Sequence, residues 1–137
     1  MMIKSESKLR VRYGETDQMG YVYYGVYAQY YEVGRVDAMR QLGFSYKDVE
    51  AKGVLMPVVE FIVNYKKPAF YDDEITIITY IKKKPEGLKI IFDYECYNSQ
   101  KELLNTGKVT LVCVDKLTQK MVKLPNWFNK ALSSFFK

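Results

Sequence analysis

Residues 23–42, YYGVYAQYYEVGRVDAMRQL, have the strongest pattern in the chain. Apolar and small residues recur there at spacings of three, four and seven, which is typical of one face of an α-helix. These residues are Tyr27, Tyr30, Tyr31, Gly34, Ala38 and Leu42. Val33, Val36 and Met39 lie off this face, so the predicted helix is apolar around much of its circumference and is expected to be buried on several sides. Gly43 is a natural C-terminal stop.

The segments on either side of this helix have the patterns of β-strands. Residues 8–13 alternate, with Leu9, Val11 and Tyr13 on one face, which predicts a half-buried strand. Four more strands are expected after the helix, and turn sequences join the last three into a meander. Their expected ranges are 59–65, 75–81, 88–96 and 103–114. The run 75–81 is nearly all apolar or Thr, as in a strand that is buried on both faces.

Two shorter helices complete the predicted fold. One covers residues 45–52, with Ser45 and Asp48 in capping-box spacing, and the other covers residues 125–136 and begins with proline. One strand, one long helix and four antiparallel strands define the α+β class, and we expect a single domain over residues 1–137. A single helix against a sheet leaves one sheet edge without a partner, so we expect the chain to dimerise.

The composition excludes several kinds of chemistry. The 137 residues include no histidine, which removes Ser-His-Asp and Cys-His catalysis and every imidazole-ligated metal site. The two cysteines, Cys96 and Cys113, are too few for a four-thiolate site and form no CxxC motif. We therefore expect no metal and no cofactor. Acid–base chemistry would fall to carboxylates, tyrosines or lysines.

The sequence also predicts where the protein works. It contains no stretch of about 20 apolar residues that could span a membrane, and residues 1–6 lack the apolar core of a signal peptide. With only two cysteines, we expect a cytoplasmic protein whose thiols are free. The net charge of +5 favours anionic partners in general.

The polar loop before the long helix contains the residue best suited to chemistry. Asp17 lies between Gly14 and Gly20, just ahead of the helix. A helix N-terminus presents free N–H groups and a partial positive charge, which can polarise a carbonyl oxygen while a nearby carboxylate attacks the carbon or activates water. The same spacing also suits a helix cap or a solvated loop residue, so spacing alone does not choose between these interpretations.

The order of residues around Asp17 gives further information on its function. Residues 13–23, YGETDQMGYVY, followed by Tyr27, Glu32 and Arg35, resemble the hotdog-fold acyl-CoA thioesterases, in particular the branch of 4-hydroxybenzoyl-CoA thioesterases and Tol-Pal-associated thioesterases. The likeness runs from residue 8 to residue 114. It implies a curved antiparallel sheet of about five strands wrapped around one long central helix. It also implies a homodimer, often paired again into a homotetramer, with active sites at the subunit interface.

The resemblance implies roles for individual residues. Asp17 would be the catalytic carboxylate, as nucleophile or general base, and backbone N–H groups around Tyr24 and Gly25 would hold the thioester oxygen. The candidates for substrate binding are Tyr13, Tyr23, Tyr27 and Glu60. The chain departs from the family's pattern at two positions, because Tyr24 stands where many members have His and Val26 where most have Asn. A phenol does not titrate near neutral pH as an imidazole does, so both changes bear on rate and substrate range.

Several charged side chains have a structural interpretation beside the functional one. Glu60 interrupts an apolar stretch, which indicates a partly buried position; it could share acid and base roles with Asp17, but we favour a pairing with a base or a backbone N–H. Glu32 and Arg35 are expected to form an ion pair on the helix. The run 82–84, three lysines, could meet phosphate groups, but we expect a solvated turn.

Hydrolysis of an acyl-CoA thioester to a free acid and CoA is the leading hypothesis for function. Hydrolysis of acyl-carrier-protein thioesters is a close alternative, because the same chemistry serves both carriers. A non-catalytic acyl-CoA-binding protein is the alternative from a different class, and Tyr24 and Val26 favour it. A nucleic-acid-binding role ranks last, since the chain has no concentrated basic stripe and no aromatic RNA-binding motif.

Overall fold

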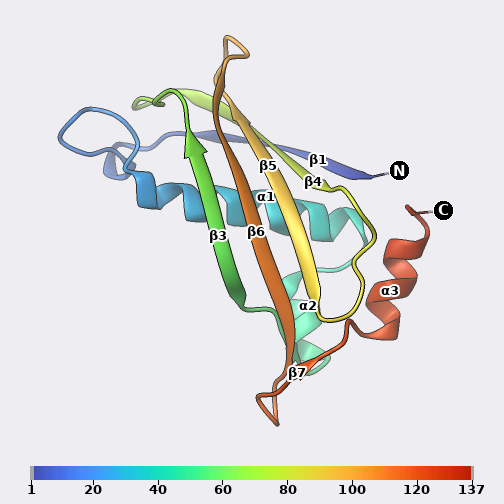
Figure 1. The fold of residues 1–137 in the computed structure, drawn as a ribbon. Helices are drawn as coiled ribbons and strands as arrows, with labels where there is room; N and C mark the ends of the chain where they lie inside the picture. The colour runs from blue at the N-terminus through green and yellow to red at the C-terminus, as the bar shows by residue number, and fades with distance from the viewer. Residues whose placement is uncertain (1, 137) are drawn as a thin grey trace.

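The computed structural model describes residues 2–136, which form one antiparallel sheet with a long helix across one face (Figure 1). The main strands follow the order β1–β4–β5–β6–β3, and short strands β2 and β7 pair with β6. The strands are β1 Ile3–Arg10, β2 Val54–Leu55, β3 Val58–Tyr65, β4 Glu74–Ile81, β5 Lys89–Tyr97, β6 Leu103–Asp115 and β7 Met121–Val122. The helices are α1 Tyr27–Gln41, α2 Tyr46–Ala51 and α3 Asn126–Ser133, with single 3₁₀ turns at Tyr13–Glu15 and Tyr24–Val26.

Helix α1 packs on the sheet through the face that the sequence predicts. Tyr27, Tyr30, Tyr31 and Ala38 are each at most 4% exposed, and the ring of Tyr31 stacks on that of Tyr94 from β5, with centroids 4.3 Å apart. The expected range of 23–42 holds as one 3₁₀ turn followed by the α-helix. The expectation that α1 is buried on several sides is wrong in part, because its opposite side, which includes Val33, is exposed in the single chain.

The first strand corrects the sequence analysis. Strand β1 covers Ile3–Arg10 rather than residues 8–13, and Tyr13 lies in a 3₁₀ turn. Its buried face contains Ser5 and Ser7, which interrupt the apolar pattern and hide the start of the strand. The Ser7 hydroxyl donates to Asp37 Oδ2 of α1 at 2.6 Å, so this polar side chain is satisfied inside the fold.

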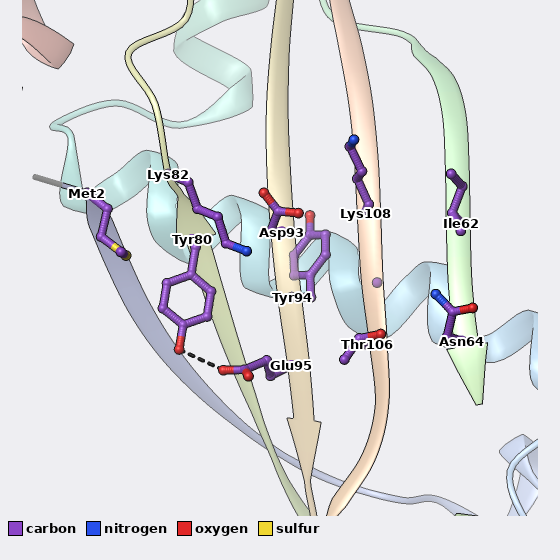
Figure 2. A pocket seen from close by; sticks show the side chains of 11 residues that line it. Met2, Ile62, Asn64, Tyr80, Lys82, Asp93, Tyr94, Glu95, Thr106 and Lys108 are labelled. Atoms are coloured by element: carbon purple, nitrogen blue, oxygen red, sulfur yellow. Dashed lines mark hydrogen bonds between the residues drawn. The ribbon is translucent and has the colours of Figure 1, made fainter. Parts of the chain in front are cut away.

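The sheet has one buried and one solvent-facing surface. Burial alternates along β4, so the prediction that this strand is buried on both faces is wrong. Ile75 and Ile77 point toward α1, whereas Tyr80 lies on the outer face beside Asp93 of β5 and Lys108 of β6 (Figure 2). A sheet packed on one side only has this polar outer surface.

The ion pair expected within α1 does not form. Glu32 is exposed, while Arg35 is only 8% exposed and its Nε donates to the hydroxyl of Tyr46 in α2 at 3.1 Å. The Arg35 side chain therefore turns toward α2, and no carboxylate pairs with it within residues 2–136. No helix in this part of the chain is both long and apolar enough to cross a membrane.

Close contact between α1 and the sheet requires glycine. A Cβ on Gly34 would lie 2.4 Å from Thr79 Oγ1 and 3.0 Å from Ile77 Cγ2. Likewise, a Cβ on Gly107 of β6 would lie 2.7 Å from the Tyr31 ring. These two positions bring helix and sheet nearer than any larger side chain allows.

Gly34→Ala is expected to lower the free energy of unfolding by about 1–2 kcal/mol, because overpacking outweighs the gain in helix propensity. Denaturant titration followed by circular dichroism measures the change. Gly14→Ala is the control, since a Cβ at Gly14 meets nothing within 4 Å. Equal stability of the two variants would contradict the close packing.

Candidate active site

A hollow of about 350 Å³ lies where the loop containing Asp17 meets the start of α1 and the end of β3. The residues that line it are Asp17, Met19, Tyr21, Val22, Tyr24, Tyr27, Tyr65, Lys66, Lys67 and Pro68. The segment after β3 fixes this arrangement, because the Val22 N–H donates to the Ala69 carbonyl at 2.9 Å. Aromatic rings, one carboxylate and two lysines therefore share one concave surface.

The loop holds the Asp17 carboxylate at the edge of this hollow. The Asp17 N–H donates to the Tyr21 carbonyl at 2.9 Å, and the Gly20 N–H donates to the Asp17 carbonyl at 3.0 Å. Gly20 has a φ of 86°, a conformation that favours glycine. Asp17 Oδ1 accepts from the Met19 N–H at 2.9 Å. Oδ2 has no protein partner within residues 2–136, so one carboxylate oxygen is free to act.

The turn at the start of the helix borders the same hollow through Tyr24. In the 3₁₀ turn Tyr24–Val26, the Val26 N–H donates to the Tyr23 carbonyl at 2.9 Å. The N–H groups of Tyr24 and Gly25 find no acceptor among the described residues. Free N–H groups at a helix start attract an anionic oxygen. The Tyr65 hydroxyl donates to the Tyr24 carbonyl at 3.1 Å and ties this turn to β3.

Aromatic packing forms the wall of the hollow. The Tyr27 ring is 2% exposed and meets the Tyr65 ring edge-on, with centroids 5.7 Å apart. Burial raises the pKa of Tyr27 above its ordinary value, so this phenol stays neutral and acts as a hydrogen-bonding group. Lys67 forms an ion pair with Glu102 at the mouth.

The structure brings together some of the predicted site residues and leaves others outside. Asp17, Tyr24 and Tyr27 line the hollow, and Gly25 follows Tyr24 in the same turn. Tyr23 does not line it, although its ring lies 4.6 Å from that of Tyr24.

Two predicted substrate-binding residues lie away from the hollow in the single chain. Tyr13 is 79% exposed and its ring meets that of Tyr71 edge-on at 5.7 Å, so it does not line the hollow. Glu60 is exposed on β3 opposite Thr110 of β6, so the expectation of a partly buried position is wrong. Strand β3 pairs only with β6 and is exposed along nearly its whole length in the single chain, so the apolar stretch around Glu60 is not buried.

Sequence reasoning missed the roles of Glu15 and Tyr65. The Glu15 carboxylate accepts from the hydroxyl of Tyr30 in α1 at 2.8 Å, and Tyr65 reaches the hollow from the end of β3. Both contacts join segments far apart in the sequence. In the sequence, only the place of Glu15 in the Asp17 motif and of Tyr65 at the end of a predicted strand marked them.

Other concave surfaces lack such a combination of groups. One of about 660 Å³ lies on the outer face of the sheet, where the Tyr80 hydroxyl donates to Glu95 and neighbouring side chains are of mixed charge (Figure 2). An adjacent groove contains the lysine run 82–84 with Lys89 and Lys108, and the run is exposed, as expected of a solvated turn. The Asp17 hollow combines a carboxylate that has one free oxygen with the turn that begins at Tyr24.

An antiparallel sheet wrapped on one long helix is the arrangement of the hotdog fold. The model of the thioesterase-like superfamily matches residues 11–132. The Bacillus subtilis protein YneP, named as an acyl-CoA thioesterase, is 40% identical over 127 residues, which cover 90% of this chain and 91% of that protein. The Escherichia coli acyl-CoA thioester hydrolase YbgC is 36% identical over 117 residues, which cover 85% of this chain and 87% of that protein.

Solved structures agree with these relatives. A DHNA-CoA thioesterase from Staphylococcus aureus superposes with a TM-score of 0.90 at 37% identity, over 97% of this chain and 91% of that one. The chain therefore belongs to the thioesterase-like superfamily, and it is a thioesterase of the hotdog fold. The predictions of family and of fold are confirmed.

Proposed function

We propose that this protein hydrolyses acyl-CoA thioesters, with Asp17 as the catalytic carboxylate and the N–H groups of Tyr24 and Gly25 as the donors to the thioester oxygen. The observation that carries the proposal is the free Asp17 oxygen on the same hollow as Tyr24, because the N–H groups of Tyr24 and of the adjacent Gly25 have no acceptor among the described residues. The names of YneP and YbgC, and that of the Staphylococcus aureus structure, all refer to CoA thioesters. The aromatic wall suits the apolar part of an acyl group.

The two possible steps for Asp17 lead to the same products. As a general base, Asp17 takes a proton from water while the water oxygen attacks the carbonyl carbon, and the C–S bond then breaks. As a nucleophile, the carboxylate attacks the carbon, the thiolate leaves, and water hydrolyses the resulting anhydride. In both routes the developing oxyanion accepts from Tyr24 and Gly25. The products are a carboxylic acid and CoA with a free thiol.

The other predicted residues take supporting positions in this scheme. Tyr27 would contact the acyl group, and Tyr23 would act through the ring of Tyr24. Tyr13 and Glu60 would reach substrate only from outside the hollow. The thiols of Cys96 and Cys113 are free and buried, which suits the cytoplasmic location that we propose.

We also propose that two copies pair through the edge of β3. Val59 is 55% exposed and Ile62 is 44% exposed on this strand, and a groove of about 280 Å³ between β3 and α1 opens at the same edge. The other sheet edge, β1, has charged residues at every solvent-facing position, which discourages pairing. Antiparallel pairing of β3 with a second copy would place the Asp17 hollow beside the subunit interface.

Asp17→Asn is expected to lower kcat/KM for acyl-CoA by at least about 100-fold, because an amide neither attacks a thioester nor accepts a proton from water. The amide oxygen can still accept from the Met19 N–H, so the fold should persist. Dye-detected thiol release from short, long and aromatic acyl-CoAs measures turnover. Asp93→Asn on the outer face is the matched control. Unchanged turnover in Asp17→Asn would contradict the role of Asp17 as the catalytic carboxylate.

The same assay separates the alternatives. Turnover of acyl-carrier-protein thioesters without turnover of acyl-CoA would assign the protein carrier as substrate. Tight acyl-CoA binding with no turnover of either would identify a binding protein, which Tyr24 and Val26 favour by their departure from the family's pattern.

The dimer predicts a solution mass of at least twice the 16.1 kDa of the chain. Ile62→Lys places like charges near each other across the proposed strand pair and is expected to raise the dissociation constant at least tenfold, a cost of about 1.4 kcal/mol. Ile91→Lys is the control, since Ile91 is 39% exposed on the outer face of an interior strand. Light scattering after size exclusion gives the mass, and a monomer mass for the unmodified protein would contradict the proposal.

A further inference from the structure

The carboxylate of Glu15 accepts more hydrogen bonds than any other side chain in the loop that contains Asp17. Oε1 accepts from the Arg12 backbone N–H and from the Tyr30 hydroxyl, each at 2.8 Å. Oε2 accepts from the Arg12 guanidinium at 3.2 and 3.3 Å. The Glu15 side chain is only 12% exposed, and Tyr30 is 4% exposed on the buried face of α1. A carboxylate two residues before Asp17 is therefore fixed to the helix.

The backbone of Glu15 continues this connection on the other side of the loop. Its carbonyl accepts from the Tyr23 N–H at 2.9 Å, directly before the turn that presents the free N–H groups of Tyr24 and Gly25. Thr16 and Val22 form an antiparallel bridge just inside this bond. The Asp17 loop is thus a closed hairpin whose base is the Glu15–Tyr23 bond, and the Glu15 side chain fastens that base to α1.

The Glu15 side chain is ionised at neutral pH. Burial acts to raise the pKa of Glu15, but hydrogen bonds from the Arg12 N–H and the Tyr30 hydroxyl, with the Arg12 charge, outweigh it and hold the pKa below its ordinary value. Glu15 is therefore an ionised acceptor, which makes strong hydrogen bonds. The exposed Arg12 guanidinium contributes little to stability, since it remains in solvent. The bond to buried Tyr30 is the contact that matters for geometry.

We propose that Glu15 is a positioning residue for thioester hydrolysis, which sets the Asp17 carboxylate at the correct distance from the N–H groups of Tyr24 and Gly25. The inference rests on the proposed function. Glu15 does not line the hollow and touches no reacting atom; it acts through the hairpin base and through Tyr30. A displacement of about 1 Å between a catalytic group and its substrate can cost on the order of 100-fold in rate.

Substitutions at Glu15 test this role by separating kcat from KM. Glu15→Gln keeps an oxygen that accepts from Tyr30 and is expected to retain kcat within about threefold. Glu15→Leu removes every acceptor and is expected to lower kcat by about 10- to 100-fold, with KM changed less than about threefold. Tyr30→Phe removes only the hydrogen bond from the Tyr30 hydroxyl, and its kcat is expected to lie between those of Glu15→Gln and Glu15→Leu. Arg12→Ala, which keeps its backbone N–H, is the control with near-unmodified kcat.

A second measurement does not depend on turnover. In hydrogen exchange, the Tyr23 and Asp17 amides are expected to exchange at least tenfold faster in Glu15→Leu than in the unmodified protein. Their exchange rates are expected to stay unchanged in Glu15→Gln. Thermal melting shows whether Glu15→Leu folds; if it does not, Tyr30→Phe replaces it in both measurements. If no thioester is turned over by the unmodified protein, the proposed function fails while the exchange data still test the positioning. Equal kcat in Glu15→Leu and Glu15→Gln, or unaltered exchange in Glu15→Leu, would overturn the positioning role of Glu15.

Discussion

The close approach of α1 to the sheet governs the rest of the molecule. Gly34 on the helix and Gly107 on β6 leave room for Thr79 and for the Tyr31 ring, so the sheet wraps a helix that can sit at only one depth. That depth fixes the first turn of α1 relative to the end of β3. The Asp17 loop is fastened to α1 through Glu15 and to the segment after β3 through Val22, so the position of the candidate site depends on helix packing as well as on the loop's own sequence.

The proposed site needs no histidine for thioester hydrolysis. Its carboxylate keeps one oxygen free, while the donors that would stabilise the oxyanion are backbone N–H groups whose orientation the helix sets. Such preorganised donors need no reorganisation during the reaction. Burial keeps the pKa of Tyr27 above its ordinary value, so this phenol is a neutral residue of the wall.

Much of this architecture could be predicted from periodicity and from the motif around Asp17. The α1 face, the capping box of α2 and the strand meander depend on local spacing, which sequence shows directly. Errors occurred where polar side chains are buried inside the fold: Ser5 and Ser7 hid the start of β1, and Arg35 turned toward Tyr46 instead of Glu32. Tyr65 could not be placed, because its contact with Tyr24 depends on tertiary packing.

The most direct test of the account is a crystal structure of Asp17→Asn with an intact acyl-CoA thioester. The account predicts a thioester oxygen about 2.7–3.1 Å from the N–H groups of Tyr24 and Gly25, with the carbonyl carbon facing residue 17. A thioester bound elsewhere, for example in the hollow on the outer face of the sheet (Figure 2), or with its oxygen turned away from these donors, would contradict it.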